Sequence, residues 1–214
     1  MHNSVKNLLL IKEQISKYKS NIEIIAVSKT FNVSKIMPLV EFGHLHFGEN
    51  KVQEAQDKWP IIVSKYKDLK LHMIGKLQTN KVKSAVRIFD YIHSVDTKKL
   101  AKKISEEQKK INRNLKLFIQ INVGNESQKG GVLVSDLQNF YNYLIDELKV
   151  NVVGLMCIPP VNSDTNFFFE EMKKINSKIG LKELSMGMSS DYIQAANHSS
   201  TFVRIGSKIF GTRD

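Results

Sequence analysis

The sequence predicts a parallel α/β fold in which eight strands close into a (β/α)8 barrel. Eight short apolar runs rich in β-branched residues alternate with helical segments of about 10–20 residues, the pattern of repeated βαβ units. The length of 214 residues suits a compact barrel, since such folds typically take about 250. An open doubly wound sheet is the alternative. Its Gly-rich turn is missing after the first run, where Ser28, Lys29 and Thr30 stand instead.

The first half of the chain begins with an extra helix and then alternates strand and helix. Residues 1–19 are amphipathic, with Val5, Leu8, Leu9, Ile11 and Ile15 on one side, which predicts a helix. Short apolar runs then predict strands, and longer periodic segments predict helices. In order, these are strand 22–28, helix 33–42, strand 44–47, helix 50–59, strand 70–74, helix 79–86, strand 91–95 and helix 97–111, the last opened by the capping residue Thr97.

The second half repeats this alternation. The run 116–123 is the clearest strand, and the strand 150–156 precedes two prolines that stop it. The expected order is strand 116–123, helix 135–148, strand 150–156, helix 162–179, strand 183–186, helix 190–198 and strand 202–205. No linker or shift of composition marks a boundary, so residues 1–214 are expected to form one domain.

The net charge of +11 raises the question of an anionic partner. All but four of the 32 basic residues are lysine, and they are spread along the chain. Readers of phosphate and base edges favour the planar fork of arginine. We therefore interpret most of the charge as lysine-rich composition, and a nucleic-acid partner is not expected. The alternative, a basic nucleic-acid binder, predicts tight and salt-sensitive binding.

The cysteine count and the hydropathy pattern bear on the compartment. The single cysteine, Cys157, excludes an internal disulfide and fits a reducing environment. No segment approaches the roughly 18 apolar residues of a membrane span, and no signal-peptide pattern is found. The sequence predicts a cytoplasmic protein without a membrane partner.

Chemistry is expected where the strands end, because the active face of a parallel barrel lies at their carboxyl ends. Lys29 follows the first strand, where partial desolvation would favour a neutral amine that attacks a carbonyl; a plain solvated lysine is the alternative. Barrels often hold phosphate between the loops after strands seven and eight. Here these loops carry 186–191 and Gly206–Ser207, with Arg204 just before them. A surface ion pair is the alternative for Arg204.

Other chemistry-bearing residues favour plainer interpretations. His44 and His46 could share a metal, but no third ligand has convincing spacing, so we expect packing histidines and no metal site. Cys157 stands in an apolar strand and is interpreted as a buried hydrophobe. The run 167–169, three phenylalanines, is expected to combine helix packing with some exposure, and a partner surface stays open.

Eight short motifs occur together and in order. They are Ala-Val-Ser-Lys-Thr at 26–30, Phe-Gly-Glu-Asn at 47–50, His-Met-Ile-Gly at 72–75 with Leu-Gln-x-Asn-Lys at 77–81, Ile-His-Ser-Val-Asp at 92–96, Gln-Ile-Asn-Val at 120–123, Gly-Leu-Met at 154–156, Leu-Ser-Met-Gly-Met-Ser at 184–189, and Val-Arg-Ile-Gly-Ser at 203–207. Together they resemble the pyridoxal phosphate homeostasis protein family, the single-domain relatives of the alanine racemase barrel. The resemblance runs over residues 22–213.

The resemblance implies an alanine-racemase-like barrel of fold type III that binds pyridoxal 5'-phosphate. Lys29 matches the lysine that holds this cofactor as a Schiff base. Ser189, Gly206 and Ser207 match its phosphate-binding positions, and Arg204 matches the arginine near its pyridine nitrogen. Asn50, Met73 and, more loosely, His72 lie in matching stretches near the cofactor. Lys76, in the Gly-x-Leu-Gln segment 75–78, is a departure at a position where the family varies. The roles of Lys76 and of the 124–131 loop stay open.

The resemblance also implies a function. In two-domain racemases a second catalytic base, a tyrosine, comes from a separate β domain, and the residues after 205 are too few to build one. We therefore expect no catalytic residues: a cofactor-binding protein of intracellular pyridoxal phosphate homeostasis, with little or no turnover. Apo-enzymes that require pyridoxal phosphate are expected as partners. The alternative is a pyridoxal-phosphate-dependent, racemase-like enzyme.

Overall fold

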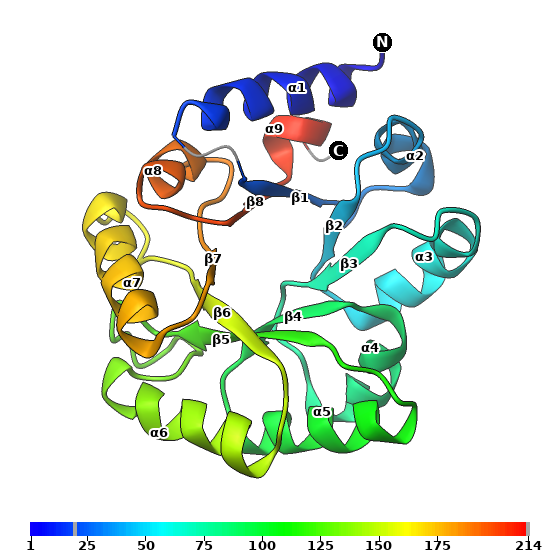
Figure 1. Ribbon diagram of the computed structural model, residues 1–214. Helices are drawn as coiled ribbons and strands as arrows, with labels where there is room; N and C mark the ends of the chain where they lie inside the picture. Colours follow the sequence, from blue (N-terminus) through cyan, green and yellow to red (C-terminus); the bar gives the residue numbers. More distant parts are fainter. Residues whose placement is uncertain (19–20, 213–214) are drawn as a thin grey trace.

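The barrel is closed and all its strands are parallel (Figure 1). The computed structural model describes residues 1–18 and 21–212. The strands follow one another around the barrel in sequence order, and β1 pairs with β8 to close it, from Glu23 opposite Phe202 to Ala26 opposite Ile205. Their bounds are β1 Glu23–Val27, β2 His46–Glu49, β3 Lys70–Met73, β4 Tyr91–Val95, β5 Lys116–Ile121, β6 Val152–Cys157, β7 Glu183–Ser185 and β8 Phe202–Ile205. The predicted barrel is confirmed.

Helices surround the strands, and α1 with α9 lies across the β1–β8 side (Figure 1). Their bounds are α1 Asn3–Ser16, α2 Val33–Glu41, α3 Val52–Lys65, α4 Val82–Ile88, α5 Lys98–Lys110, α6 Leu137–Asn142, α7 Thr165–Ile179, α8 Tyr192–Asn197 and α9 Ser207–Phe210. Short helical turns η1 Thr79–Lys81 and η2 Val134–Asp136 precede α4 and α6, and a π-helical stretch, η3 Tyr143–Glu147, follows α6.

The apolar side chains form two separate cores because each strand is buried on both faces. The larger core lies between strands and helices and contains Trp59, Phe89 and Phe169, all fully buried. The smaller core fills the barrel interior. It consists of Ile25, Tyr91, Phe118, Met156 and Phe202. A Cβ on Gly48 would lie 2.7 Å from a methyl of Ile25, so the interior is packed and is not a pore.

Several predicted elements differ in their details. The N-terminal helix buries Val5, Leu8, Ile11 and Ile15, but Leu9 is 39% exposed. The last residue predicted for this helix, Lys19, lies outside the described residues. The helix predicted to end at Trp59 continues to Lys65 through Pro60. Burial of residues on both sides of the proline, Trp59 and Ile62, compensates for the hydrogen bond that the proline removes.

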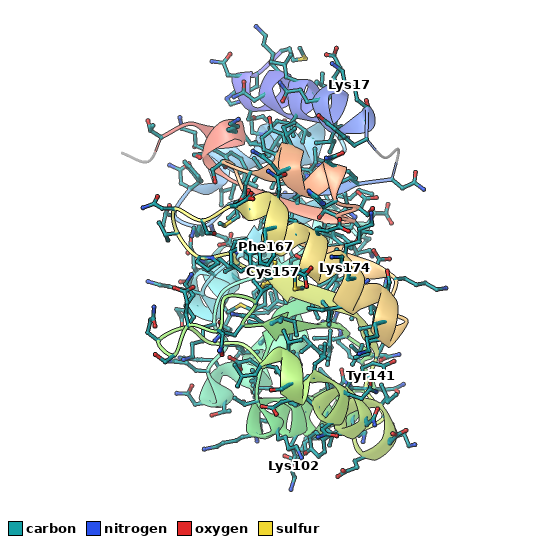
Figure 2. All side chains as sticks on the ribbon, turned by 90° about the vertical axis from the view of Figure 1, so that its left-hand side faces the viewer. Lys17, Lys102, Tyr141, Cys157, Phe167 and Lys174 are labelled. Carbon is teal, nitrogen blue, oxygen red and sulfur yellow. The ribbon has the colours of Figure 1, made fainter. Side chains whose placement is uncertain are left out.

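Exposed lysines occur on distant parts of the surface. Lys17 and Lys102 lie at opposite ends of the view in Figure 2, and both are exposed. Among residues 1–18 and 21–212, no helix has the length and apolar character needed to cross a membrane. The cytoplasmic location stays a prediction.

Candidate functional site

A cavity of about 320 Å³ opens at the carboxyl ends of β1, β6, β7 and β8. Six of the seven residues predicted to bind a cofactor line this cavity, and one of them, Asn50, follows β2. The lining residues are Val27, Lys29, Asn50, Ile74, Ile158, Met188, Ser189, Ser190, Arg204, Gly206 and Ser207. Lysine, arginine and three serines thus meet apolar walls made by valine, isoleucine and methionine. The seventh predicted residue, Met73, does not line this cavity.

Lys29 stands in a tight turn directly after β1. Ser28 N–H donates to the carbonyl of Gly48 at 3.0 Å, and Phe31 N–H donates to the carbonyl of Ser28 at 3.2 Å. Thr30 has a φ of 67°, in the left-handed region that costs energy for a residue with a Cβ. The half-buried Lys29 is therefore presented to the cavity by a turn with little conformational freedom.

Two side chains, the buried carboxylate Glu49 and Lys58, hold that turn in place, and we call this pair the clamp. Lys58 Nζ donates to the carbonyls of Ser28 at 2.8 Å and Phe31 at 3.1 Å, and pairs with the carboxylates of Glu49 and Glu54. Glu49 Oε1 also accepts from Ser28 Oγ at 2.8 Å and from the Trp59 indole at 3.1 Å. Burial raises the pKa of Glu49, while Lys58, Trp59 and Ser28 act in the opposite direction.

The loop after β7 brings Ser189 to the cavity through a close turn at Gly187. Gly187 has a φ of 91°, and a Cβ there would lie 2.5 Å from the Cβ of Ala195. Its carbonyl accepts from the backbone N–H of Arg204 at 2.9 Å. Asp191 accepts from the N–H of Met188 at 2.6 Å and so closes the turn. Only glycine fits this position, which fixes Ser189 beside the end of β8.

The loop after β8 leads into α9, a short helix that the sequence analysis did not predict. Gly206 precedes it, and the first amides of a helix have no acceptor within the helix. A Cβ on Gly206 would come within 3.3 Å of the carbonyl oxygen of Val27. The absence of a side chain here leaves room beside the hydroxyls of Ser189 and Ser207. These donors and this space suit an anionic group such as a phosphate.

Arg204 is buried, so the alternative of a surface ion pair is wrong. Its Nη1 donates to Ser185 Oγ at 2.7 Å and its Nη2 to the carbonyl of Cys157 at 2.9 Å. Burial lowers the pKa of Arg204, but a guanidinium stays protonated in proteins. The side chain therefore presents a fixed positive charge at the cavity floor.

Asn50 joins this cavity to a second one of about 570 Å³, beside α3 and the loop after β3. Met73 and Lys76 line the second cavity with Asn50. A Cβ on Gly75 would lie 2.4 Å from the carbonyl oxygen of Asn50, so the two loops are in direct contact. Lys76 is exposed and lowers the pKa of Asp96 against the larger raising effect of burial. Asn50 and Met73 thus border the site from the β3 side.

Sequence reasoning gave no role to the residues that hold Lys29 and Arg204 in place. Glu49, His93 and Ser185 occur there only within the motifs 47–50, 92–96 and 184–189, and Lys58 lies in none of them. The spacing of Glu54 and Lys58, four apart on α3, was the available signal for the clamp. The contact of Ser185 with Arg204 spans two strands and has no local signal in the sequence.

The remaining candidates lie apart from the cavity lining. His44 Nε2 lies 2.9 Å from the carbonyl oxygen of His46 and its ring packs on Phe47, in agreement with a packing role. In the described part of the chain, no group of three potential metal ligands was found. Cys157 is fully buried, and burial raises the pKa of its thiol to about 12. Phe169 is buried whereas Phe167 is 58% exposed, as the sequence analysis predicted for this run (Figure 2).

The 124–131 loop folds back onto the end of β5. The amide of Asn122 bonds with the backbone of Glu126 at 2.9 and 3.0 Å, and Glu126 pairs with Lys129. Lys129 Nζ donates to the carbonyl of Pro159 at 3.3 Å. The loop is thereby tied to the segment after β6.

The fold and the cavity define a class: a (β/α)8 barrel with one lysine after its first strand and a serine- and glycine-lined pocket between its last two loops. The family described as "Alanine racemase, N-terminal domain" matches residues 4–214. The chain belongs to this family and, within it, to the pyridoxal phosphate homeostasis proteins, as its curated relatives show. The proteins of that name from Aquifex aeolicus and Pasteurella multocida are 35% and 32% identical, covering 94% and 98% of this chain and 91% and 94% of their own.

Solved structures agree with this assignment. PipY of Synechococcus elongatus, without PLP, superposes with a TM-score of 0.90 at 33% identity, over 98% of this chain and all of that one. The structure of PipY with PLP bound gives 0.83 over 94% of this chain. Alanine racemase of Clostridium difficile gives 0.75 at 15% identity, which shows the fold alone, and this chain spans 57% of it.

Proposed function

We propose that residues 1–214 act as one pyridoxal-5'-phosphate-binding unit, which stores the cofactor for intracellular homeostasis and turns over little or no substrate. Lys29 supplies the amine that condenses with the cofactor aldehyde, with loss of water. The observation that carries this proposal is the convergence of Lys29, Arg204 and the Ser189, Gly206 and Ser207 positions on one cavity. The relatives named for this role, and PipY with PLP bound, support it.

The residues fit the cofactor chemically. The phosphate is matched by the serine hydroxyls, by the space at Gly206 and by the first amides of α9. The flat ring is matched by apolar walls from Val27, Ile74 and Ile158. Asn50 and Met73 border the ring side of the site from the second cavity. When bound, pyridoxal phosphate supplies an electron sink for bonds at the α-carbon of amino acids.

Arg204 opposes that electron sink. Its positive charge is fixed by Ser185 and by the Cys157 carbonyl, and it faces the cavity. A cation beside the pyridine nitrogen disfavours protonation of that nitrogen, and an unprotonated ring withdraws electrons less strongly. The arrangement favours holding the cofactor over using it.

The cavity lining also favours low turnover. Among the described residues that line it, Lys29 and Arg204 are the only ionisable side chains apart from the serine hydroxyls. Racemisation needs proton donors and acceptors on both faces of the substrate, and a buried arginine does not exchange protons near neutral pH. The same proposal includes delivery of the stored cofactor to apo-enzymes that require it.

Replacement of Lys29 tests the cofactor assignment. The Lys29→Ala protein should lose the visible absorbance that the wild-type protein gains with pyridoxal phosphate, because the amine that bonds to the aldehyde is gone. Lys102→Ala, which removes an exposed lysine of α5, is the matched control and should keep the absorbance. Thermal unfolding of both variants checks the fold. A folded Lys29→Ala protein with the wild-type spectrum would refute the proposal.

Proton exchange tests the absence of turnover. Alanine incubated with the loaded protein in heavy water should exchange its α-proton no faster than with the free cofactor, as measured by NMR. The racemase-like alternative predicts exchange at enzyme rates of about 1 s⁻¹ or faster that is lost in Lys29→Ala. That result would replace storage by catalysis.

A further inference from the structure

A chain of buried polar side chains crosses the barrel interior from the cavity to its opposite end. Ser185 Oγ accepts from Arg204 at 2.7 Å and lies 2.9 Å from His93 Nδ1. His93 Nε2 lies 2.9 Å from His72 Nδ1, and His72 Nε2 lies 2.9 Å from His46 Nδ1. His46 Nε2 finally faces the Glu23 carboxylate at 3.6 Å, where β1 begins. Six strands, β1, β2, β3, β4, β7 and β8, contribute these side chains.

The chain is locked by its surroundings. His72 stacks on Tyr91 and His93 on Phe118, with ring centroids 4.2 Å apart in both pairs. His72, His93 and Ser185 are fully buried. A buried polar group without a partner is costly, so each ring nitrogen must keep the partner it has. The histidines therefore cannot rotate independently of one another.

Burial also keeps the rings neutral. It lowers the pKa of His46, and it lowers the pKa values of His72 and His93 well below the usual value, with Arg204 adding to the effect on His93. A neutral imidazole has one N–H donor and one acceptor nitrogen. Adjacent rings in the chain must consequently share the same tautomer, and only two directions are possible.

The two ends select the direction. Arg204 is a donor only, so Ser185 Oγ accepts from it and its hydroxyl hydrogen is available for His93 Nδ1. At the other end the Glu23 carboxylate attracts an N–H on His46 Nε2. Asp90 acts in the same sense on His46, while Lys70 and Lys116 act against a positive charge there. Both ends favour Nε2–H on every ring.

We propose that His46, His72, His93 and Ser185 are positioning residues for Arg204, joined in one directed hydrogen-bonded chain that donates from Ser185 towards Glu23. The chain fixes the lone pairs of Ser185 on the guanidinium, which together with the Cys157 carbonyl holds two of its three nitrogens. The third nitrogen and the remaining N–H groups are then oriented by the same two anchors. The effect of Arg204 on a pyridine nitrogen rests on the proposed function. The hydrogen-bonded chain of side chains does not depend on that function.

Histidine NMR on the cofactor-free protein tests the direction. Long-range proton–nitrogen spectra at neutral pH should show the Nε2–H tautomer for His46, His72 and His93. The exposed Glu23→Gln change should mix the tautomers of His46 and leave the unfolding temperature unchanged, because it weakens the selection at that end. An Nδ1–H tautomer at His72 or His93 in the wild-type protein would overturn the proposal.

Arginine NMR tests the positioning. Ser185→Ala should make rotation of the Arg204 guanidinium faster in the cofactor-free protein. Ser200→Ala, which removes a buried hydroxyl that bonds only to backbone carbonyls, should not. His93→Gln keeps one donor and one acceptor and should restore slow rotation that His93→Leu loses. Unchanged rotation in folded Ser185→Ala overturns the proposal.

A binding measurement then separates this inference from the proposed function. Ser185→Ala should weaken pyridoxal phosphate binding by about threefold to tenfold, the value of one hydrogen bond. If the wild-type protein binds no cofactor but the NMR results are as expected, the proposed function fails while the directed hydrogen-bonded chain is supported. If Ser185→Ala binds as wild type with a mobile Arg204, the positioning role fails.

Discussion

The cavity end of the barrel and its interior are built in different ways. At the carboxyl ends of the strands, the cavity is made by loop residues that backbone contacts hold in place, as at Gly187 and in the Lys29 turn. Inside the barrel, rings from β2, β3, β4 and β5 stack on or bond to one another, and Phe202 of β8 packs edge-on against Phe118. Binding chemistry is thus placed mainly on loops above a rigid interior, and Arg204, which lines the cavity and donates to Ser185, connects the two regions.

Acid should expose this difference most strongly. Burial lowers the pKa of His44 to about 3 and those of His72 and His93 well below the unfolded value of 6.5. Their contribution to stability is present above pH 6.5 and is lost as the pH falls towards the folded pKa values, since the unfolded chain binds more protons. The unfolding free energy should fall by up to about 1.4 kcal/mol per pH unit for each histidine.

Urea unfolding between pH 7 and pH 5 measures this slope. His44→Gln should reduce it by the share of one histidine. Glu49 acts with the opposite sign, because its raised pKa adds stability below 4.5 that is lost as the pH rises. Glu49→Gln should therefore steepen the net fall on acidification. A flat profile would contradict a neutral histidine interior.

The loop end should respond to crowding at one glycine. Gly187→Ala combines a positive φ with a Cβ 2.5 Å from Ala195, and should lower the unfolding free energy by about 3 kcal/mol. Gly180→Ala is the matched control: its φ of 78° is also positive, but nothing lies within 4 Å of the new Cβ. It should cost only about 1 kcal/mol. Equal losses would show that space around Gly187 is not limiting.

The sequence predicted the barrel and most of the cavity because both depend on local order. Polar residues that follow parallel strands converge whatever the exact strand bounds, so Lys29, Ser189, Arg204, Gly206 and Ser207 lie together. Asn50 lines the same cavity, whereas the place of Met73 depends on the exact strand register. Adjacent strand residues point to opposite faces, and Met73 packs in the outer core while His72 points inward.

Other features had no local signal. The four residues of α9 are too few to show a helical period, and Pro60 argued against the last turns of α3. The histidine chain joins residues 21 to 92 positions apart, so only the closed barrel brings them into contact. Among its members, the sequence analysis expects only His46 to be a packing histidine, and it places His72 loosely near the cofactor.

Borohydride reduction followed by peptide mapping tests the central claim most directly. The protein loaded with pyridoxal phosphate is reduced, digested and analysed by mass spectrometry. We expect the cofactor mass on the peptide that contains Lys29, and nowhere else at stoichiometric level, because this lysine lines the cavity beside Arg204, Ser189 and Ser207. A stoichiometric label on Lys76 or Lys51 of the second cavity, or no label at all, would contradict the account.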